Sequence, residues 1–226
     1  MAIRTYSLRK DGTKRITEHF RVREFRCKDG SDKILISDEL VNMLEKLRAH
    51  IGKVYPDASI DINSGYRTKE HNKKIGGSST SKHIQGKAAD IFVKWNGKTI
   101  PAKEVCCTAQ DLDFDGIGYI SSDAVHVDVR GSRWWADETK SNKKIADFYA
   151  YFNIEYPVPT ATVKKGDKGT PVRWVQDKLN KAGYKVDVDG SFGGKTDKAV
   201  RKLQGDNNLT VDGKVGANTR KILSKF

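Results

Sequence analysis

Two histidines and one aspartate form the set of residues in this chain that could hold a metal ion. His83 and Asp90 lie seven residues apart in SKHIQGKAAD (81–90), and His126 lies in AVHVDVR (124–130). A catalytic zinc takes three ligands of these types and leaves its fourth position to water. With a single carboxylate among them, the ion would keep net positive charge and act as a Lewis acid in hydrolysis. A His and an Asp at this spacing also occur by chance, so the prediction depends on all three residues together.

One strand and a two-stranded hairpin are expected to position these residues. The run at 87–93 reads as a strand, and the segments 115–120 and 124–129 read as a hairpin. On a strand, His126 and Asp128 face one way while the alternating valines face the other. The same alternation is typical of a half-buried strand without any site.

The rest of the N-terminal half mixes helices and strands. Residues 36–52 carry an apolar stripe at helical spacing, 59–63 alternate as a strand does, and Pro101 begins a short helix that ends near Cys107. Strands and helices do not alternate strictly. The predicted class is therefore α+β, with a small antiparallel sheet and helices in an N-terminal domain and an all-α, three-helix C-terminal domain.

A segment with two prolines and then glycines, NIEYPVPTATVKKGDKG (153–169), marks a domain boundary. It predicts a first domain over residues 1–155, a linker over 156–162 and a second domain over 163–226.

The second domain contains an internal repeat. VDGSFGGKT (188–196) and VDGKVGANT (211–219) share Val, Asp, Gly, Gly and Thr at equal spacing, with an offset of 23 residues. Each Asp-Gly predicts a turn. Each Thr is expected to cap the helix that follows.

Composition limits the possible partners. No run approaches the ~20 apolar residues that span a bilayer, so membrane insertion is not expected. The formal net charge of +13 favours a polyanionic partner. The lysines are dispersed, and neither an RNP-like aromatic motif nor a zinc-finger spacing is present, so nucleic acid is not the predicted partner.

The cysteines and the first residues indicate the compartment in which the protein is made. Three cysteines, Cys27, Cys106 and Cys107, are an odd number with two neighbours, which argues against a disulfide framework and suits a reducing cytoplasm. The first 15 residues lack the apolar region of a signal peptide. We therefore expect synthesis in the cytoplasm.

The wider motif identifies a family. The pattern S-x-H-x-x-G-x-A-x-D at 81–90 is preceded by INSGYRTKEHN (62–72) and followed by GIGYISSDAVHVDVR (116–130). In this order and spacing the chain resembles, from about residue 20 to residue 130, the zinc D-Ala-D-Ala carboxypeptidases and the related L-Ala-D-Glu and D,D-endopeptidases of bacterial cell walls.

The resemblance implies a role for five residues. One catalytic zinc would be held by His83, Asp90 and His126. Arg67, in SGYR, matches the arginine that family members direct at the substrate carbonyl or its oxyanion, and Ser81 matches a serine that contacts the substrate.

The proton-transferring group has two candidates. Many relatives place an acidic residue three positions before the last zinc histidine, which is Asp123 here. An Asp is also common in a hairpin turn such as SSD (121–123). Asp128 is the rival candidate, and it could instead orient a zinc histidine. We favour Asp123.

Three other polar or aromatic groups are open to a structural reading. His71 and Asn72 are expected to support their loop. The tryptophans of RWWAD (133–137) would line a substrate groove or close the core.

Residues 163–224 look like the three-helix peptidoglycan-binding domain that is often fused to such enzymes. The two resemblances together predict a monomeric zinc peptidase that cuts the stem peptide of peptidoglycan, as a D-Ala-D-Ala carboxypeptidase or as an L-Ala-D-Glu or D,D-endopeptidase. A wall-binding protein with a structural, inert zinc site is the alternative. The make-up is similar to that of phage endolysins, which a holin releases during lysis; a secreted protein whose leader is missing from this sequence is the other expectation.

Overall fold

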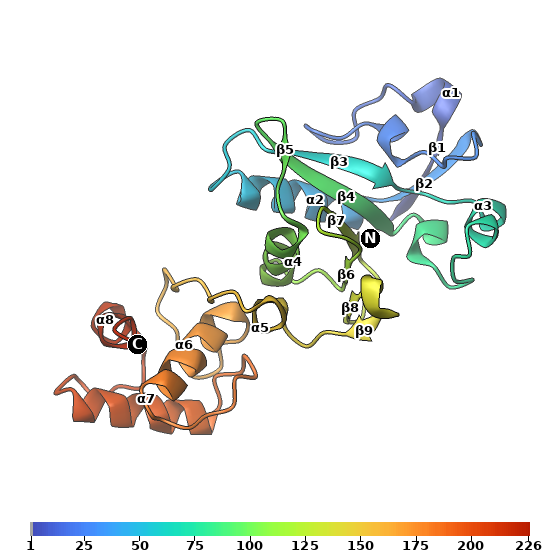
Figure 1. Cartoon of the computed structure of the whole chain (residues 1–226). Coiled ribbons are helices and arrows are strands. Elements are labelled where there is room, and N and C mark those ends of the chain that lie inside the picture. Colours follow the sequence, from blue (N-terminus) through green and yellow to red (C-terminus); the bar gives the residue numbers. More distant parts are fainter. Residues whose placement is uncertain (1) are drawn as a thin grey trace. The chain divides into compact units, whose positions relative to one another are not determined.

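The computed structural model describes residues 2–226 and divides into two compact units, Met1–Phe152 and Asn153–Phe226 (Figure 1). The division comes three residues before the predicted boundary at residue 155. The predicted linker, 156–162, belongs to the second unit, where Tyr156 packs against the core.

The first unit is built around a seven-stranded sheet with the order β3-β4-β7-β6-β8-β9 and with β5 beside β4 (Figure 1). Neighbouring strands are antiparallel except β6 and β8, which run parallel. The strands are β3 (Ser59–Ser64), β4 (Ala88–Trp95), β5 (Lys98–Thr99), β6 (Gly116–Tyr119), β7 (Ala124–Asp128), β8 (Trp134–Asp137) and β9 (Lys143–Lys144).

Helices and a second small sheet complete this unit. The longest helices, α2 and α4, both contact the large sheet and each other. Strands β1 (Ile3–Ser7) and β2 (Lys33–Ser37) pair separately as an antiparallel ribbon. The helical segments are α1 (Leu8–Asp11), η1 (Val22–Phe25), α2 (Asp38–Ile51), α3 (Lys69–Lys74), η2 (Lys82–Gln85), α4 (Ala102–Asp111), η3 (Glu138–Lys140) and α5 (Phe148–Phe152).

This content confirms the α+β class and most of the expected elements. The predicted strands appear as β3 and β4, and the predicted hairpin appears as β6 and β7. The helix after Pro101 is longer than expected, because buried apolar residues continue to Ala109 and extend α4 to Asp111.

Strand register brings the candidate ligands into one row. Asp90 of β4 lies opposite His126 of β7, and His126 lies opposite Gly118 of β6. Asp128 lies opposite Gly116 in the next row on the same face, because residues two apart on a strand share a face. One face of three strands therefore carries the polar residues of the site.

Gly86 fixes the approach to β4. Its φ of +67° lies in the left-handed region, and a Cβ there would overlap the carbonyl oxygen of Leu35 in β2. Its own carbonyl accepts a hydrogen bond from Ser37 N at 2.8 Å. A glycine is required here by both the turn and the close approach of β2.

The second unit consists of three helices around its own core, which confirms the expected C-terminal architecture. The helices are α6 (Thr170–Lys181), α7 (Gly194–Asp206) and α8 (Ala217–Leu223), and Pro171 lies in the first turn of α6. Buried apolar residues from all three helices meet, among them Val172, Trp174, Leu179, Val200, Leu203 and Leu223.

A buried glutamine closes each of the two repeated loops. Gln176 Nε2 donates to Asp189 Oδ1 at 2.8 Å and to Thr196 Oγ1 at 3.2 Å, while its Oε1 accepts from Gly190 N at 2.9 Å. Gln204 makes the same set in the second repeat. The distances there are 2.8, 3.2 and 2.9 Å, to Asp212, Thr219 and Gly213 respectively.

The expectation that the threonines cap these helices is wrong. Helices α7 and α8 begin at Gly194 and Ala217, two residues before each threonine, and glycines 193 and 216 occupy the N-cap positions. Thr196 and Thr219 therefore lie in the first helical turn, where their hydroxyls are within hydrogen-bonding distance of the buried glutamines. The sequence repeat encodes this network rather than helix caps.

The glutamine network is expected to stabilise the second unit. A Gln204→Ala substitution would leave the buried Gly213 N–H and the groups around it without their partner, at a cost of about 2–4 kcal/mol. Calorimetry should show the unfolding transition of this unit at a lower temperature. Lys198→Ala, an exposed change on the same helix, should shift stability by less than about 0.5 kcal/mol. Equal transitions for both variants would contradict the role given to Gln204.

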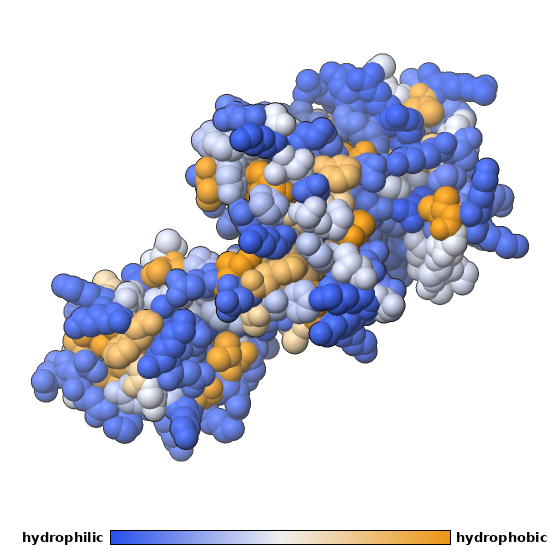
Figure 2. Space-filling model, in the orientation of Figure 1, coloured by the Kyte–Doolittle hydropathy of each residue, from blue (hydrophilic) through white to orange (hydrophobic). Residues whose placement is uncertain are grey.

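The hydrophilic surface and the unpaired cysteines fit what the composition predicts. Hydrophilic residues predominate on the face shown in Figure 2. Within residues 2–226, no helix combines the length and the apolar character needed to cross a membrane. All three cysteines are buried and free.

Candidate metal centre

His83 is oriented by the backbone beside it. The residue is 2% exposed in η2, and its Nδ1 lies 2.7 Å from the carbonyl oxygen of Gly65. A carbonyl oxygen can only accept, so Nδ1 carries the proton. The lone pair of Nε2 is then left to face Asp90 and His126.

His126 is oriented by Asp128 in the same manner. Its Nε2 lies 3.0 Å from Asp128 Oδ2, and an ionised carboxylate can only accept. Asp128 is fully buried, and Arg130 donates to it from both Nε (2.9 Å) and the backbone N (3.2 Å). The lone pair of His126 Nδ1 is left to face the other two candidate ligands.

Three electron-pair donors therefore meet at one point. The distances are 3.2 Å from His83 Nε2 to Asp90 Oδ1, 3.3 Å from His83 Nε2 to His126 Nδ1, and 3.0 Å from His126 Nδ1 to Asp90 Oδ1. A tetrahedral zinc with bonds of about 2.0–2.1 Å would separate its ligand atoms by about 3.3 Å. The spacing and the type of these donors fit zinc, as does the arrangement in which each histidine donates its other N–H to an oxygen.

The electrostatics of this group favour a cation. Burial lowers the pKa of His126, but the neighbouring carboxylates of Asp128 and Asp90 outweigh burial and raise it to about 9. Burial also opposes ionisation of Asp90, yet the neighbouring imidazoles of His126 and His83 hold its pKa well below the usual range. Both shifts stabilise positive charge among the three donors, and a bound metal ion supplies such charge.

Arg67 contacts the candidate ligand Asp90, and Ser81 is close in sequence to the candidate ligand His83. Arg67 Nη2 donates to Asp90 Oδ2 at 2.5 Å, and its Nε donates to Ser64 Oγ at 2.9 Å. Its guanidinium is thus held against the carboxylate whose other oxygen faces the histidines. Ser81 is half-buried immediately before η2, two residues from His83.

The two aspartates considered for proton transfer lie in different surroundings. Asp123 is exposed in the turn that precedes β7, and its backbone N donates to Ser121 Oγ at 3.3 Å. Asp128 is buried between His126 and Arg130, and both of its oxygens accept hydrogen bonds.

Sequence reasoning missed a third carboxylate in this region, that of Glu138. It directly follows β8, and a Cβ placed on Gly118 would overlap Glu138 Oε1 and lie 3.0 Å from the Cβ of His126. Burial raises the pKa of Glu138, and the charges of His126 and Arg67 act against that rise. The signal in the sequence is GIG at 116–118. These two glycines on one strand face leave room for the carboxylates of Asp128 and Glu138.

The two tryptophans of RWWAD have different roles. Trp134 is half-buried beside His126, with ring centroids 5.7 Å apart, and the guanidinium of Arg130 lies 4.4 Å from its ring centroid. Trp135 is 8% exposed and donates from Nε1 to Phe114 O at 3.0 Å. Trp134 flanks the candidate metal centre, and Trp135 closes the core.

A second group of metal-ligating residue types, Cys27, Asp29 and His71, also lies together. Its hydrogen bonds are satisfied by protein groups: Thr68 N donates to Cys27 Sγ at 3.4 Å, and Thr68 Oγ1 donates to Asp29 Oδ2 at 2.5 Å. The backbone N of His71 donates to Thr68 Oγ1 at 3.1 Å, and the supporting role of its side chain stays a prediction.

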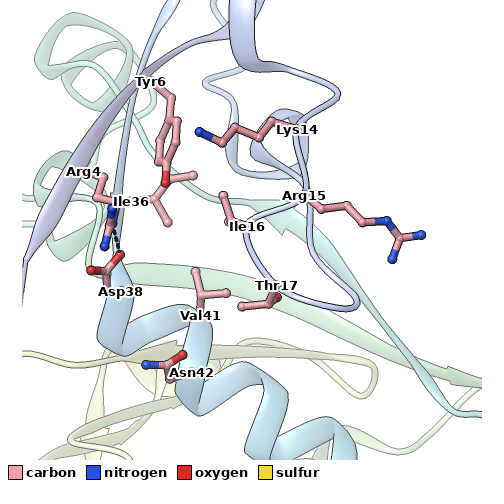
Figure 3. Close-up of a pocket in the computed structure, with 10 residues that line it drawn as sticks. All are labelled: Arg4, Tyr6, Lys14, Arg15, Ile16, Thr17, Ile36, Asp38, Val41 and Asn42. Carbon is pink, nitrogen blue, oxygen red and sulfur yellow. Dashed lines mark hydrogen bonds and ion pairs between the residues drawn. The ribbon is translucent and has the colours of Figure 1, made fainter.

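A separate hollow of about 420 Å³ lies between β1, the loop after α1 and the start of α2 (Figure 3). Arg4, Lys14 and Arg15 line it, together with Tyr6 and apolar side chains. Asp38, the acidic member of its lining, is paired with Arg4 at 2.7 Å. The hollow does not contain the three candidate ligands.

Known proteins match both parts of the chain. The family described as Peptidase M15 matches residues 16–128, and a peptidoglycan binding domain matches residues 168–223. The N-terminal domain of SleB is 36% identical over 30% of this chain and 96% of its own length, with a TM-score of 0.30. A fused Zn-dependent amidase/peptidase/peptidoglycan-binding domain protein of Clostridium acetobutylicum ATCC 824 is 43% identical over 28% of each chain, with a TM-score of 0.28. The endolysin of the Burkholderia AP3 phage is 36% identical over 28% of this chain and 25% of its own, also with a TM-score of 0.28.

Proposed function

Because this chain belongs to the peptidase M15 family of zinc metallopeptidases and carries a peptidoglycan-binding domain, we propose that it hydrolyses a peptide bond of the peptidoglycan stem peptide. The observation that supports this most directly is the buried triangle of His83, Asp90 and His126, whose donor atoms lie 3.0–3.3 Å apart. The family is one of peptidases, so the alternative of an inert wall-binding protein is set aside.

His83, Asp90 and His126 would hold one zinc ion. When bound, zinc supplies a Lewis acid that polarises a carbonyl and lowers the pKa of a coordinated water to about 7. Arg67, fixed by Ser64 and Asp90, would place positive charge beside this centre and stabilise negative charge that develops on the carbonyl oxygen. Ser81 would bind the substrate from the start of η2.

Asp128 is proposed as a positioning residue rather than a proton-transfer group. Its oxygens are committed to His126 Nε2 and to Arg130, and the side chain has no exposure to water or substrate. It keeps the proton of His126 on Nε2 and thereby leaves Nδ1 free to bind metal.

An Asp128→Asn substitution is expected to lower zinc affinity about 10- to 100-fold, because the amide no longer holds His126 in this tautomer as a carboxylate does. Competition with a chelator measures the change. Asp123→Asn is the matched control and should leave zinc affinity unchanged, since Asp123 is exposed in the turn. Equal affinities in wild type and Asp128→Asn would refute the positioning role.

The bond that is cut is identified by digestion of purified peptidoglycan and mass analysis of the released ends. Loss of one terminal D-Ala indicates a carboxypeptidase, a new N-terminal D-Glu indicates an L-Ala-D-Glu endopeptidase, and separated cross-bridges indicate a D,D-endopeptidase. Intact stem peptides in every product would refute the proposed function.

The two domains would have separate roles at the cell wall. We assign cleavage to residues 1–155, wall binding to 163–226 and the linker to 156–162. Residues 160–226 hold 15 Lys and Arg and 7 Asp and Glu, so 15 − 7 = +8 of the net charge lies there. This charge supports capture of an acidic wall polymer. We also propose that the protein is released from the cytoplasm and takes part in phage-type lysis of the cell wall.

A further inference from the structure

The sheet face that carries the metal ligands has a gap beside His126. Gly118 lies directly opposite His126 on β6, so any side chain at position 118 would project onto the same face. The glycine leaves that space to the carboxylate of Glu138, because a Cβ at 118 would overlap Glu138 Oε1. A carboxylate from the 3-10 turn after β8 thus occupies a position adjacent to a candidate metal ligand.

Parallel pairing of β8 with β6 brings Glu138 to this place. Gly118 is in register with Ala136 of β8, and Glu138 begins the 3-10 turn two residues later. Asp137 holds that turn, since its Oδ1 accepts from the backbone N of Thr139 at 2.9 Å. The turn directs Glu138 back over the sheet.

Glu138 differs from the neighbouring carboxylates in its hydrogen bonding. Its Oε1 is buried, and no hydrogen-bond partner for it exists among the described residues. Both oxygens of Asp128 accept hydrogen bonds from His126 or Arg130, and Asp90 accepts from Arg67 at Oδ2 while its Oδ1 faces the two imidazoles. An unpartnered buried carboxylate oxygen is costly, and one that lies beside a catalytic centre is available to a ligand.

Neither Asp123 nor Asp128, the two candidates from the sequence, both lies beside the candidate metal centre and has an oxygen without a hydrogen-bond partner. Asp123 is exposed and lies three residues before His126, about 10 Å along the strand direction. Asp128 is fully buried and committed to His126 and Arg130. Glu138 lies adjacent to His126 and has one buried oxygen, Oε1, without a hydrogen-bond partner among the described residues.

Building on the proposed function, we propose that Glu138 is the catalytic residue that transfers protons during peptide hydrolysis. The oxygen of the attacking water forms a bond to the carbonyl carbon while one of its protons passes to the Glu138 carboxylate. The C–N bond then breaks, and the same proton passes from Glu138 to the leaving nitrogen, which departs as an amine. The second proton of the water stays with the new carboxyl group, and Glu138 is again a carboxylate.

The test compares Glu138→Gln with wild type, with the rival variant Asp123→Asn and with the control Asp57→Asn on a soluble stem peptide. Glutamine keeps the shape of the side chain and removes the proton acceptor, so turnover should fall about a hundredfold or more. Zinc content should stay at one ion per chain, and calorimetry should show that the variant still binds the peptide. Asp57→Asn, an exposed change in the loop before β3, is the control and should keep wild-type turnover.

Gly118→Ala provides a second variant that leaves Glu138 itself unchanged. The added methyl group would displace the Glu138 carboxylate, so turnover should fall with zinc retained. The double variant Gly118→Ala/Glu138→Gln should lose no more than Glu138→Gln alone, because both changes act on one group. Losses that multiply would overturn the inference.

Two further outcomes would also overturn it. Wild-type turnover in Glu138→Gln, or its loss in Asp123→Asn with zinc retained, would move proton transfer away from Glu138 while leaving the proposed function intact. A wild-type protein that leaves every stem-peptide bond uncut would overturn the proposed function, and this inference with it.

Discussion

We expect His83→Ala to lose its zinc and to hydrolyse stem peptides no faster than protein-free buffer. The substitution removes one of three donors that meet within 3.0–3.3 Å, and two ligands cannot hold a catalytic zinc in its usual coordination. It also leaves the buried carbonyl of Gly65 without the partner it has in His83 Nδ1. Metal analysis of the purified variant, together with a peptide-cleavage assay, measures both effects.

His50→Ala is a suitable control for this experiment. His50 lies in the last turn of α2, outside the cluster of candidate ligands. The control should retain one zinc and wild-type turnover. Chelation of the wild-type protein should abolish activity, and added zinc should restore it. Full activity in metal-free protein, or in His83→Ala, would contradict the assignment of the metal centre.

The second large effect is expected from removal of the C-terminal unit. A chain that ends at Phe152 keeps the large sheet and the candidate metal centre, and should cleave a small soluble stem peptide within about twofold of the full-length rate. Lysis of intact walls should fall roughly a hundredfold or more. Under the proposed function, wall binding by the second unit raises the substrate concentration near the candidate metal centre, and the shortened chain loses this increase.

Binding of the isolated unit completes this test. Residues 153–226 have their own core of buried side chains and should sediment with purified walls. The part of this binding that depends on charge should weaken between 0.1 and 1 M salt, as the Debye length falls from ~10 to ~3 Å. Unchanged lysis by the shortened chain, with the isolated unit left in the supernatant, would exclude a targeting role.

Short-range sequence patterns were enough to predict which residues come together as the candidate metal centre, and most of the elements that hold them. His83 and Asp90 come from one continuous motif, and alternation along 124–128 already placed His126 and Asp128 on one face. The structure adds the partners that orient each imidazole. His83 is oriented by the backbone carbonyl of Gly65, and no sequence pattern predicts that contact. His126 is oriented by the side chain of Asp128, which the alternation along the strand does predict.

Glu138 could not be found in the same way because its position depends on a long-range pairing. It lies twelve residues after His126, and only the parallel register of β8 with β6 brings it to Gly118. No local spacing encodes that register. The misplaced helix caps have a related cause: Thr196 and Thr219 fit the pattern of a cap, but a buried glutamine from another helix holds them in the first turn.

The gap at Gly118 also has a consequence for evolution. A side chain at position 118 and the carboxylate of Glu138 cannot occupy the same volume, so the two positions are sterically coupled although twenty residues separate them. Positions coupled through contact tend to change together among homologues. Relatives that keep this glycine should therefore keep an acidic residue after the strand equivalent to β8. In relatives with a larger residue at 118, the carboxylate must reach the centre from a different segment of the chain.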